Sequence, residues 1–147
     1  FRKLLEESKI TTPEDTTPEG TKKSFKVDAE RKALFEIDKM NQQALIDQQK
    51  MIAENVELNV EVRKNARERQ KEEEYKLVDL VNDYSLEILK ARLKHEGKTE
   101  EQAANQILLI EKKRIKDKLL LNKNYYKQLT DLIIEQFKFL IIILLNN

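Results

Sequence analysis

The sequence contains no cysteine and no tryptophan, one histidine, and only two glycines and two prolines. Without cysteine, a disulfide framework and a zinc site with thiolate ligands are both excluded. Glycine and proline are the residues that most often form turns, so their scarcity indicates few turns. We therefore expect a small number of long secondary-structure elements.

Charged residues are abundant instead. They make up 37% of the chain, well above the usual quarter, yet the formal net charge is only +1. Hydrophobic residues, at 39%, are too numerous for a wholly disordered chain. This composition favours long, charged, amphipathic α-helices.

Both prolines lie near the start of the chain, at Pro13 and Pro18, in two copies of Thr-Thr-Pro-Glu. Each proline disfavours helical backbone at the threonine before it, although Thr-Pro-Glu is also a typical helix start. We predict an extended N-terminal arm or linker over residues 1–20.

From Thr21 to Glu96 there is no glycine or proline, so a long charged helix is predicted over residues 21–96. An interruption is expected near 56–74. Residues 56–62 alternate apolar and polar side chains as a strand does, but no turn residues flank them, and helix is the favoured interpretation. In residues 63–74 only Ala66 is apolar, so this segment is predicted to stay out of the core and either bridge packed regions or face a charged partner.

Apolar residues recur at helical spacing in three stretches, which indicates three helical faces suited to packing. The third stretch is close to a heptad repeat with one polar position, Asn122. The first comprises Ala33, Leu34, Ile37, Met40, Ala44, Leu45, Met51 and Ile52; the second Leu77, Val78, Val81, Tyr84, Ile88 and Leu89; the third Ile115, Leu119, Asn122, Tyr126, Leu129, Ile133, Phe137 and Leu140.

The clearest turn signal is the stretch from His95 to Gln102. Gly97 suits a left-handed helix C-cap, and Thr99 with Gln102 predicts a capping box for the next helix. A second helix with an apolar C-terminal tail is therefore predicted over residues 97–147, antiparallel to the first. The expected fold class is all-α: an elongated helical hairpin with an extended N-terminal arm.

The tail is an unbroken apolar run at residues 139–145. It is too short to span a bilayer as a helix, which takes about 20 apolar residues. Because it is apolar on every side, we expect another protein chain to cover it. A strand or helix end buried within this chain, and contact with a membrane, remain as alternatives. The candidate partner-contact residues are Phe137, Phe139, Leu140, Ile141, Ile142, Ile143, Leu144 and Leu145.

No catalytic residue, metal site or cofactor is predicted. The sequence lacks glycine-rich phosphate loops and the usual nucleophile and zinc-protease motifs. His95, at a predicted helix end, suits a capping or dipole role. Three consecutive carboxylates at 72–74 point in different directions on a helix and so form a solvated charge run. The protein is not expected to be an enzyme or to bind a small-molecule substrate.

Two basic clusters suggest contact with RNA phosphates, which needs clustered Lys and Arg but no particular sequence. The alternative is that both are solvated faces of charged helices. The candidate RNA-contacting residues are Arg63, Lys64, Arg67, Arg69 and Lys71 in the first cluster, and Lys112, Lys113, Arg114, Lys116 and Lys118 in the second.

Three short segments, AERKAL at 29–34, AEN at 53–55 and KNY at 123–125, resemble in order and rough spacing the long-helix protein that is twenty-sixth in the mitochondrial small-ribosomal-subunit series. That family places an extended helix along the small subunit, where it touches rRNA and neighbouring proteins without catalysis. QQAL at 42–45 and RER at 67–69 are similar to the peripheral-stalk b subunit of mitochondrial ATP synthase, a family with membrane helices that this chain does not show. The apolar tail is not part of the ribosomal pattern.

These observations predict a non-catalytic structural scaffold subunit of a large assembly, with a mitochondrial ribosome as the first candidate and rRNA and other protein subunits as its partners. The alternatives are a stalk or accessory subunit of a mitochondrial ATP synthase or respiratory complex, and a coiled-coil cytoskeletal component. Both resemblances imply a mitochondrial location, in the matrix or at the inner membrane.

Overall fold

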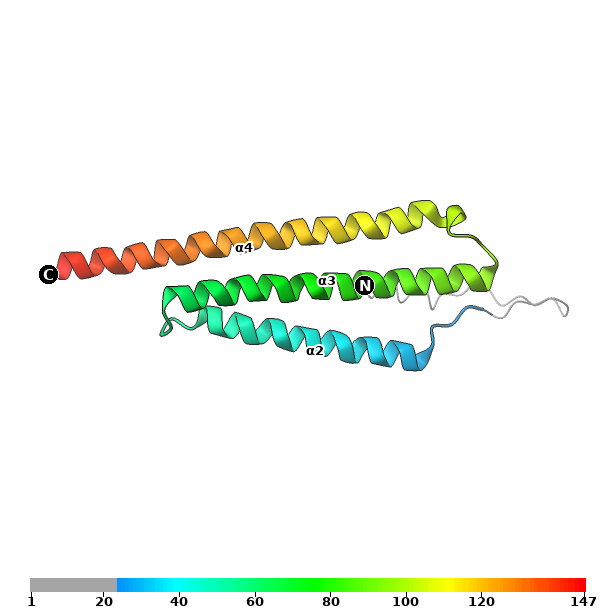
Figure 1. Cartoon of the computed structure of the whole chain (residues 1–147), viewed down its shortest axis with the longest axis horizontal. Coiled ribbons are helices and arrows are strands. Elements are labelled where there is room, and N and C mark those ends of the chain that lie inside the picture. Colours follow the sequence, from blue (N-terminus) through cyan, green and yellow to red (C-terminus); the bar gives the residue numbers. More distant parts are fainter. Residues whose placement is uncertain (1–23) are drawn as a thin grey trace. The chain divides into compact units, whose positions relative to one another are not determined.

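A computed structural model describes residues 24–147; the predicted N-terminal arm, residues 1–20, lies outside this range. The described chain is 88% helical, with three α-helices and no strand, so the predicted all-α fold class is confirmed. Helix α2 spans Ala29–Glu54, α3 spans Val60–Glu96 and α4 spans Ala104–Asn146, preceded by a single 3₁₀ turn at Glu101–Ala103 (Figure 1).

The predicted long helix is divided at residues 55–59, where two asparagines form a turn and a cap. The Asn55 side-chain oxygen accepts a hydrogen bond from the Glu57 N–H at 3.0 Å, and the Asn55 carbonyl accepts one from Leu58 at 3.1 Å. The Asn59 side chain then caps α3 by accepting from the Val62 N–H at 2.9 Å. The helical interpretation of 56–62 is therefore wrong for 56–59, and the strand alternative is wrong throughout.

The described chain forms two compact units, each containing part of every helix. Unit 1 consists of the described residues up to Lys39 together with Val78–Ile115, and unit 2 of Met40–Leu77 with Lys116–Asn147. In each unit α3 lies between α2 and α4 and makes contacts with both (Figure 1).

In unit 1, α2 packs on α3 through a stacked aromatic pair. The Phe35 and Tyr84 ring centroids are 3.9 Å apart, with their planes inclined by 12°, and Ile88 completes this buried cluster. Beside it, Arg31 forms a 2.6 Å ion pair with Glu87 and lies over the Tyr84 ring at 5.2 Å. This hydrogen bond to Glu87 raises the pKa of Arg31. Aromatic stacking and a surface ion pair thus fix the α2–α3 contact.

The other side of α3 in unit 1 packs on α4. Leu89 and Leu93 form a buried cluster with Ala103, and Ile107 and Ile110 pack against it. Residues earlier in α3 contact residues later in α4, so the two helices are antiparallel, as the hairpin prediction requires. Much of the second predicted apolar stretch is buried in these two clusters, which confirms its packing role.

The connection between α3 and α4 follows the predicted turn chemistry. Gly97 has φ of 70°, the left-handed conformation that glycine adopts most easily. The N–H groups of Gly97 and Lys98 bond to the carbonyls of Lys94 and Leu93 at 3.2 and 2.8 Å, the two bonds of a Schellman cap.

The predicted capping box follows this turn. The Thr99 N–H donates to the Gln102 side-chain oxygen at 2.9 Å, and the Gln102 N–H donates to the Thr99 hydroxyl at 3.3 Å. His95 lies in the last turn of α3, the position expected for it, and its ring centroid is 5.9 Å from that of Phe25.

In unit 2, the polar segment 63–74 is packed, contrary to the prediction. Arg63, Ala66 and Gln70 lie on one side of α3 and are all buried. Arg63 donates from Nε to the Ala53 carbonyl at 2.9 Å and from both terminal nitrogens to Glu135 at 3.2 and 3.3 Å. A polar helix can enter a core when its polar atoms find such partners, and this arginine connects α3 to both other helices.

Helix α2 in unit 2 also meets α3 through polar groups. The Gln42 side-chain amide donates to the Glu73 carbonyl at 2.8 Å and to its carboxylate at 2.6 Å. This bond, with a second from Lys76, lowers the pKa of Glu73. Apolar burial on this face of α2 is confined to single residues such as Ile46 and Ala53.

We predict that Arg63→Met destabilises the protein by about 2–3 kcal/mol, because it leaves the Ala53 carbonyl and Glu135 without their donor while keeping most of the aliphatic packing. Glu135→Gln should cost less than about 1 kcal/mol, since Glu135 is half exposed. Denaturant unfolding followed by circular dichroism measures both. Arg69→Met, at an exposed position of the same helix, is the control, and equal losses in the two arginine variants would contradict the assignment.

We also predict that Glu74→Gln stabilises the protein near neutral pH. Burial raises the pKa of the Glu74 carboxyl despite a hydrogen bond from Gln70. A raised pKa means that the stabilising contribution of this carboxyl is present at low pH and is lost as the pH rises through the folded-state value. The thermal midpoint of the variant should exceed that of the parent at pH 7, and the two should converge at about pH 4, where the carboxyl is largely protonated. A lower midpoint at pH 7 would show that the charge is needed.

Candidate interaction surfaces

The first predicted apolar stretch is exposed rather than packed against α3. Met40 and Met51 of α2 in unit 2 have 71% and 73% of their surface accessible. Helix α2 contacts α3 through another face, on which Phe35 in unit 1 and Ile46 and Ala53 in unit 2 are buried. The sequence correctly identified residues that share a face, but not which face the chain itself covers.

The third predicted stretch is largely exposed as well. Tyr125 and Leu132 are the buried residues of α4 in unit 2, and they lie about 100° around the helix from the predicted heptad positions. We call the part of this heptad in unit 2 the α4 stripe. It comprises Leu119, Asn122, Tyr126, Leu129, Ile133 and Phe137; Asn122 and Leu129 are half-buried and the others exposed.

The tail, residues 139–145, continues α4 as a regular helix and is exposed at every position, reaching 80% at Leu145. No part of the chain that the structure describes buries it. The alternative of a strand or buried helix end within the described chain is therefore wrong. The contact of the tail with a partner chain stays a prediction.

A cavity of about 790 Å³ lies in unit 2 between the turn before α3 and the base of the tail. Its wall is mainly apolar, and its charged groups include Glu61 and the Arg63–Glu135 pair. Because that pair is engaged in the fold, the cavity offers apolar contact more than chemistry. It is lined by Val56, Leu58, Asn59, Val60, Glu61, Arg63, Leu132, Glu135, Gln136, Phe139 and Leu140.

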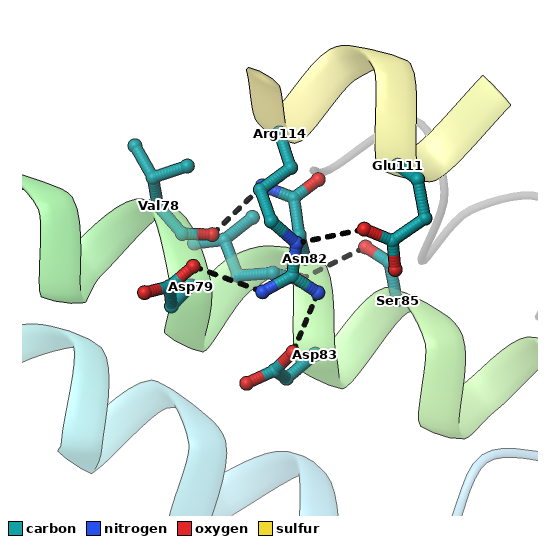
Figure 2. A network of polar contacts seen from close by, with 8 residues as sticks. Val78, Asp79, Asn82, Asp83, Ser85, Glu111 and Arg114 are labelled. Carbon is teal, nitrogen blue, oxygen red and sulfur yellow. Dashed lines mark hydrogen bonds and ion pairs between the residues drawn. The ribbon is translucent and has the colours of Figure 1, made fainter. Parts of the chain in front are cut away.

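Two of the ten candidate RNA-contacting residues are engaged inside the fold. Arg63 is the buried connector in unit 2. Arg114, in unit 1, reaches from α4 to α3, where it bonds to Asp79 at 2.9 Å and to Asp83 at 2.6 Å (Figure 2). The Glu111 carboxylate forms an ion pair with the Nε of Arg114 at 3.2 Å, without the geometry of a hydrogen bond.

The carboxylates keep Arg114 charged. Burial alone would lower the pKa of its guanidinium, but the hydrogen bonds to Asp83 and Asp79 outweigh burial and raise it. The neighbouring polar residues Asn82 and Ser85, also drawn in Figure 2, are buried and donate to carbonyls of their own helix at 2.7 and 3.0 Å. Arg114 is therefore a structural residue, and its position in a basic run did not reveal this.

Two lysines of the candidate set lie over tyrosine rings in unit 2. Lys71 is 4.2 Å from the Tyr125 ring centroid and 5.9 Å from that of Tyr75, and Lys118 is 5.7 Å from Tyr75. Such cation–π contacts hold the lysines at the α3–α4 junction. Arg67 bonds to Gln70 at 2.8 Å.

Five candidates remain exposed: Lys64, Arg69, Lys112, Lys113 and Lys116. They do not share one helix face. Arg69 lies about 140° around α3 from Lys64, and Lys113 about 100° from Lys112, whereas Lys112 and Lys116 are one turn apart. The linear clusters thus overstate the basic surface, because a run along a helix spreads its side chains around the axis.

Several structural residues were not found from the sequence. Asn55 and Asn59 form the turn and cap before α3. Both belong to residue types that favour such positions, and this signal was available. Asp79 and Asp83 are spaced one helical turn apart, but nothing in the sequence indicates that Arg114 lies opposite them.

Comparison with known protein families, curated proteins and solved structures finds no match to this chain. Within residues 24–147, no helix is long and apolar enough to cross a membrane. In the same range, no group of three His, Cys, Asp or Glu side chains is arranged to hold a metal ion.

We predict that Tyr84 and Tyr125 ionise late in an alkaline titration. Burial is the main cause that raises the pKa of both phenols, and for Tyr125 the charges of Glu68 and Glu72 add to it. Their stabilising contribution is present below the unfolded-state value and is lost as the pH rises through the folded-state value. Phenolate absorbance should show a phase above about pH 10 that shrinks in Tyr84→Phe and Tyr125→Phe, and an unchanged curve in both would contradict the prediction.

Proposed function

We propose that this protein is a non-catalytic structural subunit of a large assembly, which it enters through the exposed apolar faces of α2 and α4. The observation that carries the proposal is the α4 stripe: apolar side chains at heptad spacing, exposed on a helix whose own packing uses another face. Apolar surface of this kind on a soluble chain is typical of a face that another protein covers.

Covering these apolar faces with a partner would be favoured by a substantial free energy. Covering an apolar side chain that is now about half exposed is worth roughly 1 kcal/mol. The tail alone carries Phe139 to Leu145 at exposures between 41% and 80%, so a partner that covers it gains on the order of several kcal/mol before the cost of association. This favours a permanent subunit over a transient binding module.

A mitochondrial ribosome is the first candidate for the assembly. Support comes from the resemblance at 29–34, 53–55 and 123–125 and from the exposed cations Lys64, Arg69, Lys112 and Lys113. On such a particle these side chains would contact rRNA phosphates, and the apolar faces would contact neighbouring proteins. Location in mitochondria belongs to the same proposal.

A second candidate is a stalk or accessory subunit of a mitochondrial ATP synthase or respiratory complex. The tail favours it, because residues 139–145 form an exposed helix without a charged side chain. In this case the tail would lie in a protein groove at the membrane boundary.

To test the proposal, a tagged form of the full chain is purified from cells with its native complex, and the co-purifying RNA and proteins are identified. We predict abundant small-subunit rRNA and ribosomal proteins. Lys64→Ala, Arg69→Ala, Lys112→Ala and Lys113→Ala together should reduce the rRNA several-fold, and more so at raised salt, because phosphate contacts weaken with ionic strength.

The matched control replaces Lys26, Lys50, Lys90 and Lys94, exposed lysines outside both the candidate set and α4. ATP synthase or respiratory subunits without rRNA would replace the first candidate with the second. A chain that co-purifies with no other protein or RNA would contradict the role of structural subunit.

A further inference from the structure

The exposed side of α4 in unit 2 combines an apolar stripe with a row of lysines. We propose that the α4 stripe docks an amphipathic helix of another protein whose apolar face is bordered by acidic side chains. This inference rests on the proposed function and names the chemistry of the partner.

The spacing of the stripe points to a helix as the occupant. Its members follow one another at intervals of three and four residues, the pattern that fits the ridges of a second helix. One polar residue, Asn122, sits within the stripe. A coiled-coil seam commonly holds a single asparagine, which sets register, whereas a face buried in lipid would leave its amide unsatisfied.

The charged residues beside the stripe determine whether acidic or basic side chains on the partner are favoured. Lys116, Lys123 and Lys127 are exposed, and each directly follows a heptad position of α4: Ile115, Asn122 and Tyr126. In a coiled coil, side chains beside the seam pair with charges on the facing helix. We call these three residues the lysine row. Asp131, one turn after Lys127, is an exposed carboxylate at the end of the row.

The other border of the stripe is formed at the junction with α3 and is mixed in charge. Lys71 lies over Tyr125 there, and the charges of Glu68 and Glu72 act on the same ring. Because these charges offset one another, selectivity depends on the lysine row. An antiparallel second copy of α4 would bring two lysine rows together, and their repulsion disfavours that arrangement.

The test uses two synthetic amphipathic helical peptides with the same heptad of leucines, one bordered by glutamates and the other by lysines. Each carries a fluorophore, and binding to the full chain is followed by anisotropy at low and at physiological salt. We expect the glutamate peptide to bind at least tenfold more tightly at low salt, with a preference that shrinks as salt rises.

Charge reversal supplies the decisive comparison. Lys116→Glu, Lys123→Glu and Lys127→Glu together should invert the preference, and the corresponding glutamine changes should remove it without inversion. The control variant Lys26→Glu, Lys50→Glu and Lys94→Glu alters the net charge equally at exposed positions elsewhere and should keep the parent preference. Circular dichroism checks that each variant retains its helix content.

Several results would overturn the proposal. Equal binding of both peptides, or a preference unaffected by reversal of the row, would show that the row does not select the partner. Sedimentation of the chain as a dimer that Tyr126→Glu dissociates would make a second copy the occupant. Binding to phosphatidylserine vesicles or to an RNA oligonucleotide that depends on the row, without selectivity between peptides, would make the face a membrane or RNA contact. If peptide selectivity is absent but the chain still co-purifies with a native complex, the structural role stands and this inference alone fails.

Discussion

Unit 2 depends on the buried guanidinium of Arg63. The Arg63 residue is only 8% exposed, yet its guanidinium finds a hydrogen-bond partner on each neighbouring helix: the Ala53 carbonyl near the end of α2 and the Glu135 carboxylate on α4. The carbonyls in the last turn of a helix lack partners within that helix. Arg63 donates a hydrogen bond to one of these carbonyls. A single side chain therefore holds the end of α2, the start of α3 and the base of the tail together.

Arg114 fulfils a related role in unit 1, with Asp79 and Asp83 as its partners across α3. In both units the contacts between helices therefore rely heavily on directional polar groups. Hydrogen bonds and ion pairs of this type specify register better than they add stability, because desolvation offsets much of their gain. Apolar burial is confined to small clusters such as Phe35 with Tyr84 and Leu89 with Leu93.

The fold class, the turn at Gly97 and its capping box could be predicted because each follows from local rules: composition, a positive φ and side-chain to backbone bonding. The expected interruption near 56–74 lies at 55–59, but the two asparagines that form its turn and cap were not recognised from the sequence. The burial of Arg63 could not be predicted from the sequence. It depends on Ala53 and Glu135 meeting in space, and no local pattern encodes that meeting.

The candidate site shows the same division. Periodicity identified the residues of the α4 stripe correctly, because a helix places residues three and four apart on one side. It could not tell whether the chain or a partner covers that side. The basic runs led to the opposite error. Their proximity in sequence suggested one basic surface, but on the helix Arg114 points into the fold and Arg69 lies on a different side from Lys64.

Polar interfaces within the chain and apolar faces outside it have a common consequence for stability. A chain whose helices meet through hydrogen bonds gains little net free energy from its own packing. Covering the α4 stripe and the tail would add the apolar burial that the isolated chain lacks, so binding and folding are thermodynamically linked. A partner of this kind would act as part of the core, and the affinity of the complex and the order of the helices would then rise and fall together.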